Sequence, residues 1–320
     1  MSNMKKKWLI VAAALCAVGI IICCVAMTVL GWDFRKLSTQ NEEINTHKID
    51  AEYSNISIDT STFDVEFLPS VDGKTTVVCH ETDKIWHSVA VKEGTLYIEQ
   101  VDERMFYDCM GVSFYSSEIT VYLPVGEYGA LSVKCHTGDV EIPSGYTFES
   151  VSIDVSTGDV ECAASSVGAL NIKTTTGDIT LRDAVAGSVS LSTSTGDVET
   201  GNIACAGDIA LCVSTGEACF KNVSCKNFIS DGTTGDITLK NVIASERFDI
   251  ERNTGDVELY GCDAAKIRIE TSTGDVSGSL LSEKIFIIKT DTGEVDVPRG
   301  VSGGECEIET DTGDIEITIG

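Results

Sequence analysis

Basic residues are scarce in this 320-residue chain, which has 23 lysines and arginines against 50 aspartates and glutamates and a formal net charge of −27. A body this acidic repels nucleic-acid phosphate and anionic lipid, so neither is expected as a direct partner. Divalent cations, cationic peptides or basic polymers would be attracted instead. The hydrophobic share of 42% is too high for a disordered acidic tail, so we expect the chain to fold.

Metal and cofactor motifs are also missing. The sequence has no Cys-x-x-Cys, and its four histidines, His47, His80, His87 and His136, are scattered, with His80 and His136 each directly after a cysteine. Zinc sites normally show closer Cys and His spacing. We therefore expect no metal and no cofactor. The cysteines outside the apolar N-terminal stretch would either pair in an oxidising compartment or pack as small buried hydrophobes.

A long uncharged run lies near the N-terminus. Trp8–Leu30 has 23 residues without a charge, about 34 Å as a helix, which suits a hydrocarbon core of about 30 Å. Lys5, Lys6 and Lys7 precede it, so the positive-inside rule places the N-terminus in the cytoplasm and the body outside. A cleaved signal peptide is the alternative, but its apolar region is normally about 7–15 residues and ends in a small-x-small site. The pattern favours a retained single-pass anchor in the cell membrane.

Thr-Gly followed by Asp or Glu recurs ten times at intervals of 19 or 20 residues. The turn glycines are Gly138, Gly158, Gly177, Gly196, Gly216, Gly235, Gly255, Gly274, Gly293 and Gly313. A fixed period of this kind is typical of a solenoid, in which each copy forms one coil and buries its apolar face against neighbouring coils.

Apolar and polar residues alternate on both sides of each turn glycine. Val151, Ile153 and Val155 stand seven, five and three residues before Gly158, and this period of two predicts a half-buried strand. The second and fourth residues after the glycine are again apolar, which predicts a second strand. An apolar residue seven past the glycine is expected to line a third side, as in Ile203, Val223, Val242 and Leu281.

The turn changes which residues face inward. Five positions separate the last inward residue of one strand from the first of the next, whereas continuous alternation would need an even number. Glycine adopts positive φ without steric cost, and aspartate hydrogen-bonds nearby backbone in turns. No 3.6-residue period accompanies the repeat. We predict an all-β fold, a parallel β-solenoid of about ten coils spaced by about 4.8 Å.

The residues before the array have a different pattern. Residues 49–131 are rich in short strand-like runs without the Gly-Asp turn, although Thr60–Val65 is similar to a degenerate copy with Phe63 in the glycine place. Terminal repeats are commonly atypical because they cap the core. The predicted organisation is a cytoplasmic N-terminus (1–7), a transmembrane anchor (8–30), a linker (31–48), a strand-rich lead-in or cap (49–131) and the solenoid (132–320).

An apolar anchor, a strand-rich lead-in ending at Leu123-Pro124, and Ser/Thr-Thr-Gly-Asp-Val/Ile copies together resemble a bacterial family. It is the β-strand-repeat domain of unknown function labelled "putative adhesin", and the similarity covers about residues 45–320. The resemblance implies a surface location and no catalytic residue. Some members of the family are similar to accessory proteins of cell-envelope stress systems.

The acids that follow the turn glycines are the first candidate site. A column of carboxylates at about 4.8 Å would repel unless cations or hydrogen bonds offset the charge, so calcium is one interpretation. In the other, each acid accepts backbone N–H bonds of its turn. The pattern favours the turn role, because strong calcium repeats place several acids and glycines in one turn. The calcium candidates are Asp139, Asp159, Asp178, Asp197, Asp236, Asp256, Asp275 and Asp314.

A cysteine pair is the second candidate site. Cys205 and Cys225 each lie nine residues past a turn glycine, so adjacent coils place them side by side. The ladder spacing of about 4.8 Å falls within the Cα separation of a disulfide. The two thiols either form a disulfide or stay free.

No catalytic residue stands out. Acids are spread along the array rather than gathered with a base, and no loop departs from the repeat period to build a cleft. We predict a non-enzymatic, membrane-anchored surface solenoid that acts as an adhesin-like or scaffold protein, with an envelope polymer or protein as an unidentified partner. An accessory ectodomain of an envelope stress system is the alternative, and a polysaccharide-active enzyme is the third.

The end of the chain allows one further prediction. The last coil carries Glu305, Glu307, Glu309, Asp311, Asp314 and Glu316. Charge on an exposed edge is a common way for sheets to resist edge-to-edge growth. We therefore expect this coil to be the terminal rung and to keep the array from polymerising.

Overall fold

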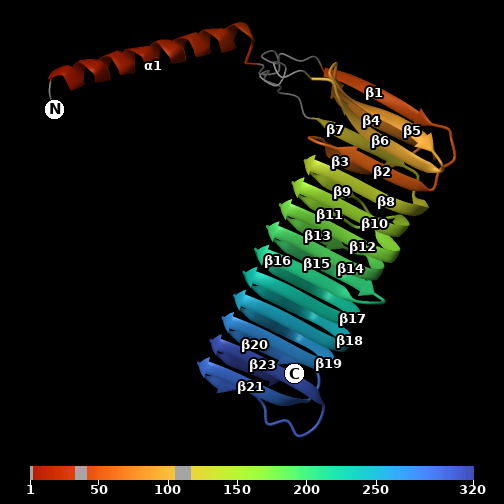
Figure 1. The fold of residues 1–320 in the computed structure, drawn as a ribbon, viewed down its shortest axis with the longest axis vertical. Helices are drawn as coiled ribbons and strands as arrows, with labels where there is room; N and C mark the ends of the chain where they lie inside the picture. The colour runs from red at the N-terminus through yellow and green to blue at the C-terminus, as the bar shows by residue number, and fades with distance from the viewer. Residues whose placement is uncertain (1–2, 33–41, 105–116) are drawn as a thin grey trace.

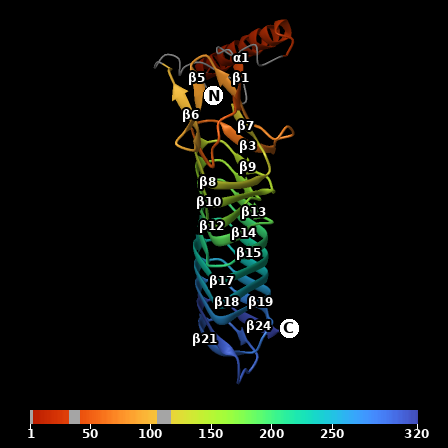
Figure 2. The same cartoon turned by 90° about the vertical axis from the view of Figure 1, so that its right-hand side faces the viewer.

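A computed structural model describes residues 3–32, 42–104 and 117–320. Helix α1 (Asn3–Val29) precedes strands that coil into a rod (Figure 1; turned by 90° in Figure 2). Within α1, Ile10–Val29 has a mean hydropathy of 2.9 and is long and apolar enough to cross a membrane, as an anchor or as a signal sequence.

The strands at the N-terminal end of the rod are β1 (Glu42–Ile49), β2 (Asn55–Thr60), β3 (Asp64–Pro69), β4 (Thr75–Thr82), β5 (Ile85–Lys92), β6 (Thr95–Asp102) and β7 (Glu118–Leu123). The array follows with β8 (Gly126–Thr137), β9 (Val140–Ile142), β10 (Tyr146–Thr157), β11 (Val160–Cys162), β12 (Ser165–Thr176), β13 (Ile179–Arg182), β14 (Val185–Thr195), β15 (Val198–Cys205), β16 (Ile209–Thr215), β17 (Ala218–Thr234), β18 (Ile237–Thr254), β19 (Val257–Thr273) and β20 (Val276–Leu280). The C-terminal strands are β21 (Lys284–Thr292), β22 (Val295–Asp296), β23 (Gly304–Thr312) and β24 (Ile315–Ile319).

Each coil pairs in parallel with its neighbours in one fixed phase. In β10, Val151, Ile153 and Val155 face Leu131, Val133 and Cys135 of β8 on one side. The same three residues face the next coil in β12 on the other side. All of these apolar positions are buried, and together they form one continuous core along the rod. The predicted parallel β-solenoid of about ten turns is confirmed.

The turn glycines hold each coil close to the previous one. Their φ angles lie between 122° and 157°, a region that side chains rarely adopt. A Cβ on Gly177 would lie 2.0 Å from the carbonyl oxygen of Gly158, and the same contact recurs along the array. Glycine is therefore required twice at this corner, by the backbone angle and by the close approach.

The first coil is the degenerate copy made of β2 and β3. Phe63 occupies the place of a turn glycine. A Cβ on Gly138 would lie 2.4 Å from the carbonyl oxygen of Phe63, and elsewhere in the array the atom in that place is a turn glycine's carbonyl oxygen. β2 pairs with β8, and β3 pairs with β9. Phe63 itself is buried and packs edge-on against His87. The expected degenerate repeat is confirmed at this position.

Antiparallel strands close the N-terminal end above this coil. β6 and β7 add one more parallel rung, and then β5 pairs antiparallel with β6. β4 lies antiparallel between β7 and β1. We call β1 and β4–β7 the cap, which forms the upper end of the rod in Figure 1.

The third side of the coils follows the prediction except in one place. Ile203, Val223 and Val242 are buried, whereas Leu281 is 52% exposed. Leu280 takes the inward place, because the pairing of β19 with β20 shifts by one residue and sets Leu280 opposite Cys262. The expectation for Leu281 was wrong for this reason.

The order of coils at the C-terminal end differs from the order in the sequence. β23 lies between β19 and β21, and β24 lies between β20 and β22. The last residues of the chain therefore fill an interior rung, and β21 with β22 forms the terminal one. The prediction that residues 304–320 make the exposed edge was wrong. All coils share one register, so a coil can stack on a neighbour that does not precede it in the sequence.

Candidate functional site

The turn aspartates connect one coil to the next. The Asp159 N–H donates to Oδ1 of Asp139 at 2.8 Å, and the Asp178 N–H donates to Oδ1 of Asp159 at 2.8 Å. The column begins in the first coil, where Oδ1 of Asp64 accepts the Asp139 N–H at 2.9 Å. The same bond recurs at Asp197, Asp256, Asp275 and Asp314.

These bonds bear on the predicted calcium column. One oxygen of each bonded carboxylate is occupied by a backbone N–H of the neighbouring coil. Among the residues that the structure describes, the turn acids do not bring three ligand oxygens within 4.8 Å of one another. Asp236 lies in the same column, and calcium binding along it stays a prediction.

The predicted cysteine pair lies on adjacent coils inside the core. Ile203 and Ala204 face Val223 and Ser224 in parallel register, which sets Cys205 beside Cys225. Both thiols are buried and free. Burial, and then the neighbouring Cys205, raises the pKa of Cys225 to about 12. The disulfide stays a prediction, since the structure brings the residues together without a bond.

A second corner of the coil carries a ladder of amide side chains that the sequence analysis missed. Asp183, Asn202, Asn222 and Asn241 each lie six residues past a turn glycine and have φ angles of 53–59°. Asn202 Nδ2 donates to Asp183 at 2.8 Å, and Asn222 Nδ2 donates to Asn202 at 3.0 Å. Aligning the copies on their glycines reveals this column, because Asn and Asp tolerate the left-handed region.

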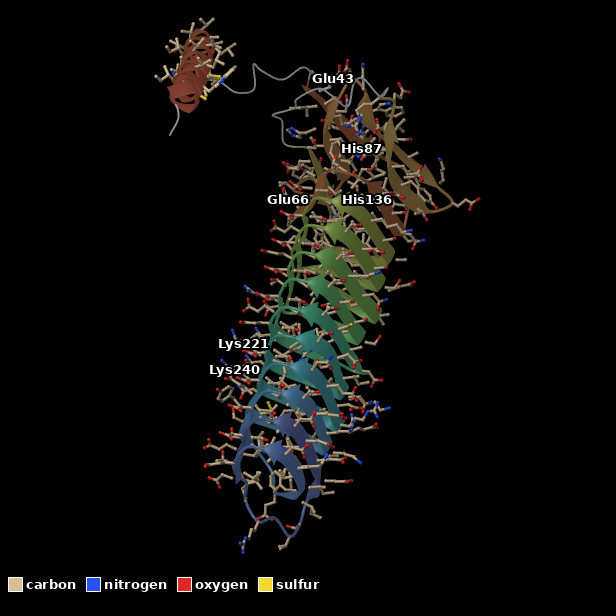
Figure 3. All side chains as sticks on the ribbon, turned by 60° about the vertical axis from the view of Figure 1, so that its left-hand side comes forward. Glu43, Glu66, His87, His136, Lys221 and Lys240 are labelled. Atoms are coloured by element: carbon tan, nitrogen blue, oxygen red, sulfur yellow. The ribbon has the colours of Figure 1, made fainter. Side chains whose placement is uncertain are left out.

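A polar cluster is buried in the cap, which contains His87 (labelled in Figure 3). Nδ1 of His87 lies 2.9 Å from Oε1 of Glu81, and Asn45 Nδ2 donates to Oε2 of Glu81 at 2.7 Å. Burial and then Glu81 raise the pKa of Cys79 to about 12, so this thiol is protonated at neutral pH. Ligand atoms of Cys79, Glu81 and His87 lie within 4.8 Å of one another. Each already has a hydrogen-bond partner, and the cluster joins β1, β4 and β5.

Glu66 lies on the outer wall of the first coil (Figure 3), and the pKa of its carboxyl is raised. Burial raises the pKa of its carboxyl, and the negative charges of Glu118 and Glu141 raise it further. Glu66 and Glu118 also share a hydrogen bond. A carboxyl pair of this kind retains a proton more readily than an isolated glutamate.

A hollow lies on β8, β10 and β12, beside the segment that leads from the cap strand β1 into β2. We call it the junction groove, and it has a volume of about 690 Å³. Its lining residues are Ser54, Glu127, Tyr128, Gly129, Thr147, Phe148, Glu149, Val167 and Gly168. Glycine lets the coils approach closely here, because a Cβ on Gly168 would lie 2.6 Å from the carbonyl oxygen of Glu149.

The half-buried Tyr128 lines the junction groove and acids form its rim. Tyr128 stacks on Tyr53 with 6.4 Å between ring centroids, and its ring centroid lies 5.8 Å from that of Phe148, which is fully buried. The Tyr128 hydroxyl donates to the Pro124 carbonyl at 2.6 Å, which fixes the ring. Glu127 and Glu149 are exposed. An acidic rim beside a tyrosine ring suits cationic groups, which aromatic quadrupoles and carboxylates both attract.

Comparison with known proteins identifies a family match. The family model described as Toastrack DUF4097 matches residues 53–212 and 200–320. No curated protein matches the chain.

Several solved structures match the chain at low identity and with TM-scores below 0.5. A "putative adhesin" from Bacteroides fragilis is 20% identical, with a TM-score of 0.42, over 87% of this chain and 97% of that one. A "putative lipid binding protein" from Parabacteroides distasonis is 18% identical, with a TM-score of 0.44, over 75% of this chain and 95% of that one. A "putative adhesin" from the same organism is 12% identical, with a TM-score of 0.41, over 85% and 98%.

Proposed function

This chain belongs to the Toastrack DUF4097 family, and we propose that it is a non-enzymatic surface rod, tethered to the cell membrane by α1, that binds an envelope polymer or protein. The junction groove carries this proposal, because it combines the half-buried Tyr128 with an acidic rim on an otherwise regular array.

The tether supports a role at a surface. α1 contains a 20-residue span whose side chains are almost all exposed, as expected of a helix that is solvated by lipid rather than by protein. The rod extends from the cap through the coils of the array (Figure 1). Its net negative charge opposes contact with an anionic membrane surface. We propose that the body stands in the extracytoplasmic space.

The chemistry of the junction groove suggests a cationic ligand. Glu127 and Glu149 lie on successive coils, and Glu127 directly precedes Tyr128. An ammonium or guanidinium group would contact the Tyr128 ring and a carboxylate together, which is stronger than either contact alone. A basic polypeptide or an amino-bearing envelope polymer fits this description.

A charge-reversal experiment tests the proposal. Full-length protein in nanodiscs would be titrated with polylysine and with isolated cell-wall polymer. Glu127→Lys/Glu149→Lys is expected to weaken binding at least about tenfold, and added salt is expected to weaken binding by the unaltered chain. Asp154→Lys/Glu161→Lys makes the same change of net charge outside the groove lining and serves as the control. Equal losses in both variants would show general charge attraction and no groove site.

The cap gives specific support to a second candidate function, an accessory ectodomain of an envelope stress system. A further hollow of about 600 Å³, lined by Asp50, Glu52, Tyr53 and Lys74 among others, adjoins the junction groove through Tyr128. This surface belongs to the non-repetitive cap and first coil rather than to the array. Lys74→Glu should then impair a stress response in cells while leaving polymer binding by purified protein unchanged.

A further inference from the structure

The two ends of the rod are closed differently. At the N-terminal end, antiparallel cap strands cover the first coils. At the C-terminal end, among the strands that the structure describes, β21 pairs only with β23 and β22 only with β24. The other edge of this terminal rung presents unpaired backbone groups, which natural sheets normally protect.

The side chains of the terminal rung differ from those of every other coil. The outward positions lie eight and six residues before the turn glycine. In eight of the nine other coils both positions carry small, polar or charged residues, and in the ninth one of them is Ile229. In the terminal rung they are Ile285 and Ile287, which are 46% and 49% exposed. Val295 on β22 and Val301 in the following loop are also exposed at this end.

The core is open at the same place. Phe286 and Ile288 point inward, yet they are only partly buried, whereas the corresponding residues of the interior coils are fully buried. The loop 297–303 lies at one corner of this end (Figure 1). Lys284 is buried there, and its Nζ donates hydrogen bonds to Asp263, to the Ala264 carbonyl and to Ser282. A solenoid normally needs a polar capping unit at its end, and the terminal rung has an apolar edge instead.

The charges of the terminal rung complement a second copy of themselves. Consider two β21 strands that pair antiparallel so that Phe286 of one faces Phe286 of the other. The numbers of any two facing residues then add up to 572, and each Ile285 faces Ile287 of the other copy. In the same register Glu283, which accepts a hydrogen bond from Ser302, faces Lys289, which pairs with Glu309 in its own chain. Facing residues share one side of a sheet, so apolar residues meet at the centre and opposite charges at the ends.

We propose that the C-terminal rung is a homophilic contact, in which β21 of one chain pairs antiparallel with β21 of a second copy. The pairing covers Phe286 and Ile288 and satisfies the open backbone edge. A two-fold axis at this contact joins two rods end to end and places their caps at opposite ends. Resting on the proposed membrane tether, this geometry suits chains anchored in two facing membranes.

Vesicle clustering tests this contact without any envelope partner. The full chain would be reconstituted in phosphatidylcholine vesicles, and clustering would be followed by light scattering, with sedimentation velocity of the detergent-solubilised chain in parallel. The unaltered chain is expected to cluster vesicles and to dimerise. Ile287→Lys is expected to weaken both at least about tenfold. Ile229→Lys changes the same repeat position in the middle of the array and should leave both unchanged.

A charge exchange tests the register. Glu283→Lys and Lys289→Glu should each weaken dimerisation, and the double variant should restore it. A detergent-solubilised chain that stays monomeric at its highest attainable concentration, or that dimerises equally well with Ile287→Lys, would overturn the proposal. Failure of the double variant to recover would overturn the antiparallel pairing. Loss of polymer binding in the groove variant Glu127→Lys/Glu149→Lys, with clustering intact, would separate this contact from the proposed envelope function.

Discussion

Single residues at the turn determine how closely the coils stack. Each glycine corner lies on the backbone of the previous coil, and each bonded aspartate reaches back to hold the next N–H. The turn therefore combines a steric requirement at glycine with a bonding role at aspartate, and the two can be tested separately.

Gly177→Ala tests the steric requirement. Its φ is 141°, and the new Cβ would lie 2.0 Å from the Gly158 carbonyl oxygen, so the free energy of unfolding is expected to fall by at least about 2 kcal/mol. Gly201→Ala is the matched control, because no atom lies within 4 Å of its Cβ position. Urea unfolding measures both. Equal effects of the two variants would contradict the close-approach explanation.

Asp178→Ala and Asp178→Asn separate hydrogen bonding from charge. Oδ1 of Asp178 accepts the Asp197 N–H at 2.7 Å. Alanine removes the acceptor and should lower the free energy of unfolding by about 1 kcal/mol, whereas asparagine retains an acceptor and should cost less. Urea unfolding with and without calcium is the measurement. If calcium stabilised the unaltered chain and neither variant, the column would bind the ion after all.

The buried Glu81 gives the cap a pH dependence. Burial alone would raise the pKa of Glu81, but hydrogen bonds from His87 and Asn45 outweigh it and hold the pKa below the ordinary 4.5. A lowered folded pKa gives stability that is present above the unfolded pKa and is lost as the pH falls through the folded one. The protection of the β4 and β5 amides, measured as the exchange rate relative to the intrinsic rate at the same pH, should therefore fall below about pH 4.5. Glu81→Gln should remove that acid-dependent step, and a persistent step would assign it to another group.

At the scale of the element, the coil is the unit that stacks, and its place in the stack is independent of its place in the sequence. The phase of the turn glycines is the same between β19 and β23 as between β23 and β21. Residues 304–320 therefore fit the interior slot with the same ladder contacts that they would make at the end.

Engineered disulfides test this order. Glu270 and Glu309 are direct partners across β19 and β23, and the parallel spacing of about 4.8 Å is within disulfide range. Glu270→Cys/Glu309→Cys should oxidise to a cross-link. Glu270→Cys/Lys289→Cys should not, because that pair is two rungs apart. Peptide mass spectrometry identifies the linked residues, and a cross-link only in the second pair would indicate stacking in sequence order.

The sequence predicts the coil well and the ends poorly. Alternation around the glycines identifies Val151, Ile153 and Val155 as core, and Phe63 is found as a degenerate turn because Thr62 before it and Asp64-Val65 after it match the other copies. The interior place of residues 304–320 has no such signal, since periodicity reports the length of a coil and not its neighbour. The junction groove is also hidden, because Tyr53, Tyr128 and Phe148 come from three separate segments and meet only through strand register.

At the scale of the whole molecule, the chain combines an apolar helix, a closed cap, an acidic rod and an open apolar end. The acidic walls keep copies apart along their sides, since like charges repel at distances up to about a Debye length. The only contacts that the account predicts between copies lie at the terminal rung. This arrangement favours end-to-end contact over lateral aggregation.

Labelling of Cys212 on intact cells tests the central claim, a tethered rod outside the membrane, most directly. Within the array Cys212 is exposed and Cys219 is half-buried, whereas Cys205, Cys225 and Cys262 are buried, so a membrane-impermeant maleimide should react first with Cys212. We expect labelling of the array in intact cells, its loss in Cys212→Ser/Cys219→Ser, and retention of the labelled chain in membranes washed with alkaline carbonate. Labelling only after permeabilisation, or release of the labelled chain by the wash, would contradict the account.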